Sequence, residues 1–294
     1  MVDIGSLDIE ITNHCTNGCR FCPYSSMKRP RGFMEFATFI EVVKLARQFS
    51  ALITLSGMGD PLAHPIFFDF IAVLRREGVR YGVQMNPRSL LRNPGMLQKF
   101  KQARVQSMTI SFPSTKKEVF EALIPGCDFE AALEVTLSLH AFSRSYGGTV
   151  RVLGLITSMN KEEERTYLDF WRNLGLRGWV RRCHSRGGHL DNGLNTAAVI
   201  KRRIHGCWLF DAHGFVTWNG DYLACCHDLA GESVFGNVSY GGEEKFLEAR
   251  ALVKRQWPPF SACNSCDEEF KAPPRRIRKG FKRLLFNDVH YSTS

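Results

Sequence analysis

Apolar residues recur with two different spacings through the first two-thirds of this 294-residue chain. Short apolar or alternating runs, typical of β-strands, are followed by stretches in which apolar residues return every three or four positions, typical of one helix face. The expected strands are residues 7–12, 51–55, 79–85, 106–112 and 149–156 and a sixth that begins at residue 179; the expected helices are residues 35–49, 66–76, 129–142 and 162–174. Repeated strand–helix units predict an α/β fold whose parallel sheet forms either an open sheet or a partial barrel.

The pattern changes after residue 201 to turns rich in glycine, aromatic residues and cysteine. We place a boundary near residue 195, which divides the chain into a first domain (1–195), a second domain (196–270) and a tail (271–294). Within the second domain, Asn219–Tyr222 is expected to form a hairpin turn, because Gly220 can take the positive φ that such turns need. This hairpin would bring Cys207 and Cys225 together.

The overall composition is that of an ordinary globular protein, with 44% hydrophobic and 23% charged residues. No window approaches the roughly 18 consecutive apolar residues that a membrane span needs. The first residues, Met1–Gly5, lack the basic start and the apolar run of a signal peptide. We therefore expect a cytoplasmic protein that makes no membrane contact.

The formal net charge of +10 is concentrated in the tail, where Lys271–Arg283 holds seven basic residues and no acidic one. A tail of this kind can contact nucleic acid or an acidic partner, but it is more often a solvated surface segment. No aromatic interleaving and no RNA-binding motif accompanies it, so nucleic-acid binding is not favoured.

Ten cysteines in a cytoplasmic chain favour metal ligation over disulfide bonds, because the cytosol keeps thiols reduced. Cys15, Cys19 and Cys22 follow the first expected strand, separated by three and then two residues. Three thiolates on one loop can hold a [4Fe–4S] cluster and leave one iron without a protein ligand. A zinc site is the alternative, but zinc needs a fourth ligand, and His14 is poorly placed beside Cys15 to supply it.

A second cysteine group comprises Cys207, Cys225, Cys263 and Cys266. Four thiolates in two separated pairs suit either structural zinc or a fully ligated [4Fe–4S] cluster. The spacing alone leaves both interpretations open.

The first cysteine motif resembles the signature of the radical S-adenosylmethionine (radical SAM) family, Cys-x3-Cys-x-aromatic-Cys, with Phe21 at the aromatic position. The resemblance implies a partial (β/α)6 barrel whose active site lies at the carboxyl ends of the strands, and a cluster whose open iron chelates SAM. The second cysteine group resembles the twitch domain, a truncated form of the SPASM domain. It implies a small cysteine-rich C-terminal domain that holds one auxiliary [4Fe–4S] cluster.

Further positions resemble SAM-binding elements of that family. The segment Ser56–Pro61, which contains Gly57, Gly59 and Asp60, resembles the Gly-Gly-Glu-Pro motif that binds the SAM amino group, with Met58 in place of the second glycine and Asp60 in place of the glutamate. A plain turn is the alternative. Polar residues at strand ends are candidates for the ribose or the carboxylate of SAM, or are simply turn and surface residues: Asn86, Ser111 and Arg151.

Two cysteines outside both groups are candidate hydrogen-atom donors, with core packing as the alternative. Cys226 adjoins Cys225, and because neighbouring strand residues face opposite ways it is expected to point into the substrate cavity. Cys183 ends the sixth strand near the same cavity. Basic residues there are expected either to favour a substrate carboxylate or phosphate or to form a solvated rim: Arg181, Arg182, His184 and Arg186.

The resemblance implies that a 5′-deoxyadenosyl radical abstracts hydrogen from a small polar substrate, sugar-like or aminocyclitol-like, in natural-product biosynthesis. A fully ligated auxiliary cluster favours loss of an electron from the substrate radical, so that an alcohol becomes a ketone. Alternatives are an epimerase that uses Cys226 or Cys183, a peptide-modifying enzyme, and a zinc-stabilised nucleic-acid-binding protein. An electron donor such as flavodoxin or ferredoxin is the expected protein partner.

Overall fold

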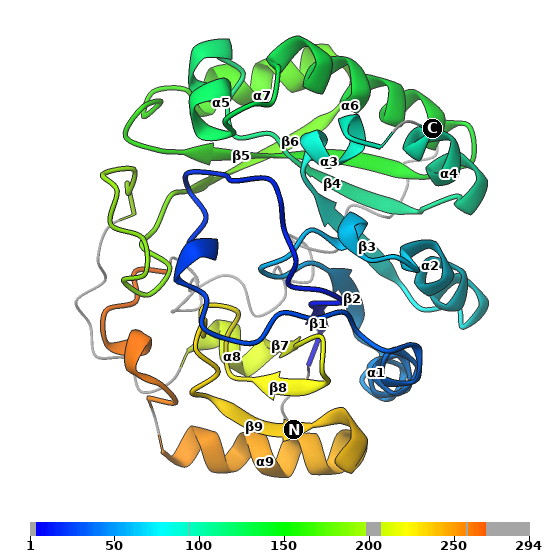
Figure 1. The fold of residues 1–294 in the computed structure, drawn as a ribbon, viewed down its shortest axis with the longest axis vertical. Helices are drawn as coiled ribbons and strands as arrows, with labels where there is room; N and C mark the ends of the chain where they lie inside the picture. Colours follow the sequence, from blue (N-terminus) through cyan, green and yellow to red (C-terminus); the bar gives the residue numbers. More distant parts are fainter. Residues whose placement is uncertain (1–3, 94, 198–206, 257, 269–294) are drawn as a thin grey trace, which may run out of the picture.

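The computed structural model describes residues 4–93, 95–197, 207–256 and 258–268, and these residues form a curved sheet with helices along its outer side (Figure 1). The strands are β1 (Ser6–Ile9), β2 (Leu52–Leu55), β3 (Tyr81–Met85), β4 (Ser107–Ser111), β5 (Thr149–Ile156), β6 (Arg177–Arg182), β7 (His213–Val216), β8 (Asp221–Leu223) and β9 (Val234–Asn237). The helices are α1 (Phe36–Gln48), α2 (Phe67–Arg76), α3 (Pro87–Leu91), α4 (Met96–Ala103), α5 (Lys117–Leu123), α6 (Phe129–Arg144), α7 (Glu164–Asn173), α8 (Trp208–Ala212) and α9 (Glu243–Arg255).

The sheet order is β6-β5-β4-β3-β2-β1-β7-β8-β9, and β1 to β6 are parallel. The α/β class and the six parallel strands that the sequence predicts are therefore confirmed. The sequence does not predict helices α3, α4 and α5, because five to eight residues are too few to display a helical period clearly.

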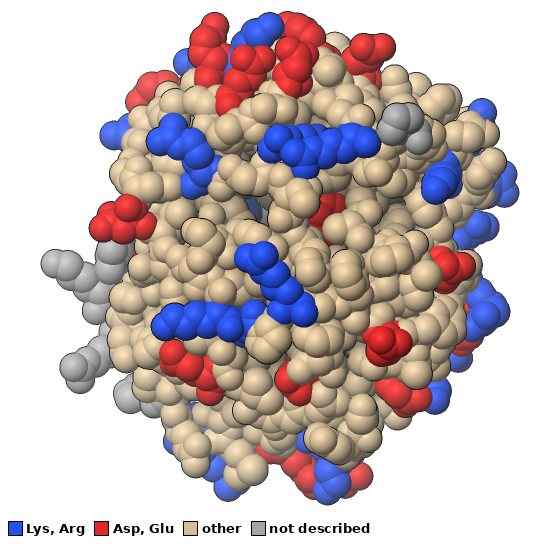
Figure 2. Space-filling model, viewed as in Figure 1, with Lys and Arg blue, Asp and Glu red and all other residues tan. Residues whose placement is uncertain are grey.

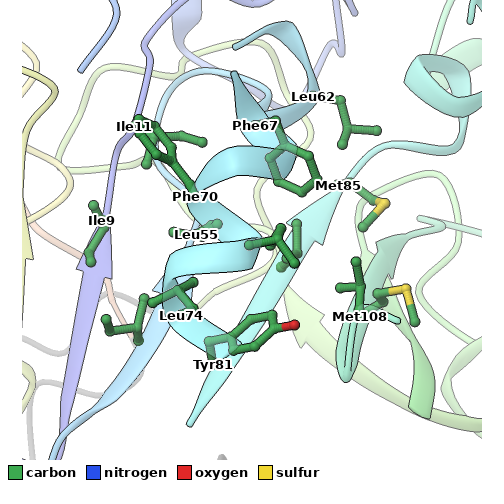
Figure 3. Close-up of a cluster of buried hydrophobic side chains, with 14 of the residues drawn as sticks. Ile9, Ile11, Leu55, Leu62, Phe67, Phe70, Leu74, Tyr81, Met85 and Met108 are labelled. Atoms are coloured by element: carbon green, nitrogen blue, oxygen red, sulfur yellow. The ribbon is translucent and has the colours of Figure 1, made fainter. Parts of the chain in front are cut away.

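The outer face of the sheet is the apolar one. Alternate strand residues such as Leu55 and Met85 are buried and pack with Phe70 of α2 (Figure 3), which is fully buried. A fully buried phenylalanine contributes about 1.5–3 kcal/mol relative to an exposed one. The intervening positions on the inner face, including Thr54 and Gln84, are only half-buried. The strands are thus held by their outer contacts, which leaves polar groups on the concave side.

Strands β7 to β9 extend the same sheet beyond β1. Strand β7 runs parallel to β1, and β8 and β9 add antiparallel neighbours. The predicted hairpin joins β7 to β8, and Gly220 has a φ of 87°. His213 links the two parts further, since its Nδ1 lies 2.6 Å from Ser6 Oγ and its Nε2 lies 3.0 Å from Asp8 Oδ2. The sheet is continuous across the boundary we expect near residue 195.

Within the described ranges, no helix has both the length and the apolar character needed to cross a membrane. The basic tail from Lys271 onward lies outside the described residues.

Candidate functional site

The loop of residues 13–24, here called the cysteine loop, follows β1 and lies on the concave side of the sheet (Figure 1). It brings the three predicted ligands Cys15, Cys19 and Cys22 together. Burial raises the pKa of Cys15 to about 11, and the thiol of Cys22 adds to the rise. Burial also raises the pKa of Cys19 and Cys22, and at Cys19 both other thiols contribute. Buried, grouped thiols of this kind lose their protons when they bind a metal, so the set fits the iron–sulfur cluster that the motif implies.

Asp60 is joined to the cysteine loop by a buried hydrogen-bond network. Its Oδ2 accepts from Asn17 Nδ2 at 2.8 Å and from the Ser89 hydroxyl, and its Oδ1 accepts from the Leu62 backbone N–H at 2.9 Å. Its own N–H donates to the His14 carbonyl. The sequence predicts that Asp60 binds SAM; in the structure the residue is 6% exposed and its carboxylate is occupied by these protein donors. Its role in SAM binding stays a prediction, whereas its contact with the loop is direct.

Two arginines of the α3 region clamp the exposed side of the loop. Arg88 Nη1 donates to the Asn17 carbonyl at 2.5 Å, and Arg92 Nη1 donates to the Thr16 carbonyl at 2.9 Å. The sequence pattern singles out neither these arginines nor Asn17. The sequence does indicate the start of α3, because an asparagine before a proline, here Asn86-Pro87, is typical of a helix N-terminus.

Gly57 and Gly59 allow the chain after β2 to pack directly on the chain after β1. Gly57 has a φ of 134°, and a Cβ there would lie 2.7 Å from Glu10 Cβ. A Cβ on Gly59 would overlap the Thr12 carbonyl oxygen. These two predicted SAM-site positions are therefore required to be glycine by the packing beside the cysteine loop.

Glu10, at the end of β1, is fully buried and forms a salt bridge with Arg29 at 2.6 Å. Glu10 Oε2 also accepts from the Met58 backbone N–H at 2.9 Å. This ion pair joins the end of β1, the segment after β2 and the chain that follows the cysteine loop. Removing one partner of a buried pair costs about 3–5 kcal/mol, which sets the scale for breaking this junction.

The remaining predicted SAM-site residues occupy three different positions. Asn86 lies against the cysteine loop, and its Nδ2 donates to Cys19 Sγ at 3.3 Å. Ser111 is half-buried at the last residue of β4, where the strand reaches the carboxyl edge. Arg151 is near the opposite end of the sheet, since its Nη2 donates to Ser107 Oγ at the first residue of β4. The geometry brings Asn86 and Ser111, but not Arg151, to the end of the sheet that carries the cysteine loop.

Three members of the second cysteine group, Cys207, Cys225 and Cys266, lie near one another. Cys207 is close enough to Cys225 and to Cys266 for the thiols to affect one another's pKa, although burial is the main reason that the pKa of Cys207 is raised. Cys263 lies three residues before Cys266, in the short helix Ser261–Asn264. The four residues come from the start of α8, the chain just after β8 and the region of this short helix, and their half-buried side chains suit either a cluster or zinc.

The expectation that Cys225 and Cys226 face opposite ways is wrong. Their side chains hydrogen-bond to each other, and Cys226 also contacts the imidazole of His227. The reason is local backbone structure: β8 ends at Leu223, and residues 225–228 form a turn in which the Asp228 N–H donates to the Cys225 carbonyl. Strand alternation does not apply there, so Cys226 lies with the second cysteine group.

A buried ionic network ties this group to the end of β6. Glu268 accepts from Arg181 at 3.0 Å and lies 3.3 Å from His184 and 3.6 Å from His227. Burial alone would raise the pKa of Glu268, but Arg181, His227 and His184 together lower it to about 2. Arg181 and His184 are expected from the sequence to meet a substrate anion; the anion they meet here is this glutamate.

Donor atoms of His184, His227 and Glu268 lie within 4.8 Å of one another, a spacing that a metal ion can use. Arg181 already binds the carboxylate, and Arg186 Nη1 lies 3.4 Å from His227 Nε2. Two guanidinium groups at the same donor atoms oppose a divalent cation, so we interpret these residues as an ion-pair network.

Cys183 lies in a small apolar cluster with Leu123, Leu190 and Leu194, and Phe21 of the cysteine loop packs against the same cluster. Its side chain is 2% exposed, and burial raises the pKa of its thiol to about 11. Cys183 is therefore a buried thiol with a raised pKa, in the apolar cluster against which the aromatic residue of the first motif packs.

Comparison with known proteins agrees with this geometry. The family model of the radical SAM superfamily matches residues 9–170, more than half of the chain. Among curated proteins, a match is found to the tungsten-containing aldehyde ferredoxin oxidoreductase cofactor-modifying protein of Pyrococcus furiosus, 29% identical over 82 residues. The match covers 27% of this chain and 23% of the relative, so the chain spans about a quarter of the length of the curated protein that it matches.

Solved structures share the fold over nearly the whole chain. BtrN in complex with AdoMet and 2-DOIA is 16% identical with a TM-score of 0.59, over 90% of this chain and 94% of BtrN. SuiB of Streptococcus suis bound to the precursor peptide SuiA is 13% identical with a TM-score of 0.66, over 91% of this chain and 70% of SuiB. The anSMEcpe structure with bound AdoMet and the Cp18Cys peptide is 11% identical with a TM-score of 0.59, over 89% of this chain and 85% of that chain. At these identities the likeness establishes the fold alone.

Proposed function

The chain belongs to the radical SAM superfamily, and on this premise we propose that it oxidises an alcohol of a small polar metabolite to a ketone. The proposal assigns a SAM-binding [4Fe–4S] cluster to Cys15, Cys19 and Cys22 and an auxiliary [4Fe–4S] cluster to the second cysteine group. When bound, the first cluster and SAM supply the radical that takes one hydrogen atom from the carbinol carbon, and the auxiliary cluster supplies an acceptor for the electron that the substrate then gives up.

The observation that supports the proposal is the proximity of three cysteines of the second group, beside strands that extend the sheet from β1. Strands β7 and β8 continue that sheet from β1, and Cys207, Cys225 and Cys266 meet at their end. Four protein thiolates would leave no open iron in an auxiliary cluster, so electron acceptance is the role that remains for it. Oxidation balances on this basis, because the substrate loses one hydrogen atom, one proton and one electron.

The position of Arg186 supports the proposal that the substrate is polar. It is half-buried, has a φ of 54°, and extends toward both cysteine groups: it contacts His227, and its charge is felt at Cys22 and at Cys226. A non-glycine residue in the left-handed region is often strained for a functional reason. Within the proposal, Arg186 holds a hydroxyl or oxyanion of the substrate between the two clusters.

The proposed electron donor, such as flavodoxin or ferredoxin, would approach the face of the molecule on which the cysteine loop lies. Figure 2 shows Lys and Arg side chains across the middle of this face, whereas acidic side chains gather along the edge over α5 and α7. Arg20, Lys28 and Arg92, on or near the cysteine loop, are all exposed. A basic surface at this position favours a partner with an acidic surface.

The test is metal analysis followed by product analysis. Anaerobically reconstituted protein is expected to hold about eight iron atoms with matching sulfide, two four-iron clusters. Alanine at all four cysteines of the second group is expected to remove about half of the iron and to leave SAM cleavage measurable, whereas alanine at Cys15, Cys19 and Cys22 abolishes 5′-deoxyadenosine formation. Four iron atoms and one zinc in the native protein would rule out the oxidation mechanism.

Epimerisation is the second candidate function, and the placement of Cys183 supports it. A buried thiol with a raised pKa, in the apolar cluster against which Phe21 packs, is suited to give a hydrogen atom to a substrate radical. Cys226 has less support for this role, because it lies against Cys225 in the second cysteine group. In heavy water an epimerase incorporates solvent deuterium at the inverted carbon, and Cys183→Ala stops this. An oxidase gives a product two hydrogens poorer than the substrate, and the same variant leaves that product unchanged.

A further inference from the structure

Two asparagine side chains point N–H groups at sulfurs of the cysteine motif: Asn17 lies within the motif and Asn86 lies outside it. Asn86 Nδ2 lies 3.3 Å from Cys19 Sγ, and Asn17 Nδ2 lies 3.6 Å from Cys15 Sγ. Both are within the usual range for hydrogen bonds to sulfur, which is longer than for oxygen. Both asparagines are nearly enclosed, with exposed fractions of 6% for Asn86 and 3% for Asn17.

The orientation of each amide is set by its other hydrogen bonds. Asn86 Oδ1 accepts from the Arg88 backbone N–H at 2.9 Å as the N-cap of α3, which leaves Nδ2 to face Cys19. Asn17 Nδ2 donates to the carboxylate of Asp60 at 2.8 Å and to Ser89 Oγ at 3.1 Å, so the contact with Cys15 Sγ shares one of these two hydrogens. Because a carboxylate only accepts, the bond to Asp60 identifies this atom as the nitrogen. Exchanging oxygen and nitrogen in either side chain would break these bonds, so the network determines that the N–H groups are the ones near sulfur.

We propose that Asn86 and Asn17 raise the reduction potential of the cluster held by Cys15, Cys19 and Cys22. Reduction adds negative charge to a cluster and its thiolates, and an N–H donor at a thiolate sulfur stabilises that charge. The two amides therefore make the cluster easier to reduce, and the reduced cluster is the form that cleaves SAM. The inference rests on the assignment of the cluster to these three cysteines, and it makes the asparagines positioning and tuning residues rather than direct ligands of SAM.

Asn86 is the better position for a test, because substitutions that keep the helix cap are available. Serine and aspartate are both good N-caps, so Asn86→Ser and Asn86→Asp retain the bond to the Arg88 N–H while removing the amide donor. The matched control is Asn93→Ser at the other end of α3, where the asparagine donates to the Ser89 carbonyl and is exposed. Asn17 is less suitable, since it also holds Asp60.

The experiment is a reduction titration of the reconstituted full chain followed by electron paramagnetic resonance, read on the signal that changes when SAM is added. We expect a more negative midpoint potential in Asn86→Ser and a still more negative one in Asn86→Asp, whose carboxylate adds charge, and no shift in Asn93→Ser. Proton resonances coupled to the cluster supply an independent measurement. One proton that exchanges in heavy water is expected to be lost in both Asn86 variants and kept in the control.

An unchanged or less negative potential in Asn86→Ser, with full iron content, refutes the tuning role. Retention of the exchangeable proton in both Asn86 variants refutes it as well. Absence of any SAM-responsive signal in the unmodified protein is a different result, since it contradicts the cluster assignment on which the inference rests.

Discussion

Replacing Asp60 by asparagine separates two roles that this residue could have. The family resemblance implies contact with the SAM amino group, whereas the structure shows a carboxylate that accepts from Asn17, Ser89 and Leu62 beneath the cysteine loop. Asparagine has nearly the same shape but replaces one acceptor oxygen by an NH2 group. In either orientation of the new amide, an N–H then faces another N–H, of Asn17 or of Leu62.

The expected loss in stability of the closed cysteine loop follows from this one pair of opposed N–H groups. A buried donor left without an acceptor costs about 1–3 kcal/mol, which corresponds to an increase of about 5- to 150-fold in the population of the opened loop. Because the loop carries all three proposed cluster ligands, its opening exposes the iron. Iron release from the SAM-binding cluster to a chelator is therefore expected to accelerate by a similar factor in Asp60→Asn.

The assay uses anaerobically reconstituted protein and follows iron release with an absorbing chelator. Asp128→Asn is the matched control, because Asp128 caps α6 through a bond to the Ala131 N–H at an exposed position on the outer side. Wild-type iron release in Asp60→Asn, together with weaker SAM binding, would refute the reasoning and support direct SAM contact instead. Fast iron release that SAM does not slow, with a normal rate in the control, supports the loop-holding role.

Three further changes test other parts of the site. Gly59→Ala places a Cβ on the Thr12 carbonyl and is expected to abolish SAM cleavage and lower iron content, whereas Gly82→Ala, whose Cβ would have no neighbour closer than 3.7 Å, should retain both. Arg29→Met leaves the fully buried Glu10 without its partner and is expected to cost about 3–5 kcal/mol, measured as a lower thermal midpoint that Glu10→Gln in the same chain partly restores. Burial lowers the pKa of His64, whose ring nitrogens are hydrogen-bonded to the Met34 carbonyl and the Ile66 N–H. The contribution of His64 to the stability of the protein is therefore full above the ordinary pKa of 6.5, and it is lost as pH falls through the lowered pKa of the folded state. The thermal midpoint should show this acid loss in wild-type protein, and a persistent loss of equal size in His64→Gln would assign it to another group.

The elements that the sequence predicts best are those with a long, regular period. Strand β5 has the predicted bounds, and α6 begins at the predicted residue, because eight alternating positions and sixteen helical ones leave little ambiguity. The spacing of Cys15, Cys19 and Cys22 likewise places three thiols on one loop, whereas the assignment of the second group rests on its resemblance to the twitch domain. Cys225 and Cys226 show the limit of this reasoning: alternation does not extend past the end of β8, where the chain enters a turn.

The support around the cysteine loop could not be predicted in the same way, and the reason is geometric. Asn17, Asp60 and Ser89 come from three segments that meet only because β1, β2 and β3 are adjacent parallel strands with their carboxyl ends at one edge. A motif records which residues bind the cofactor, but nothing in its spacing records which distant residues fix the orientation of those ligands. The same holds for Glu268, which is 87 positions from Arg181 and supplies the anion that the basic residues of β6 would otherwise require from a substrate. Charge along the sequence therefore indicates that an anion is needed, and only the fold decides whether the protein already provides it.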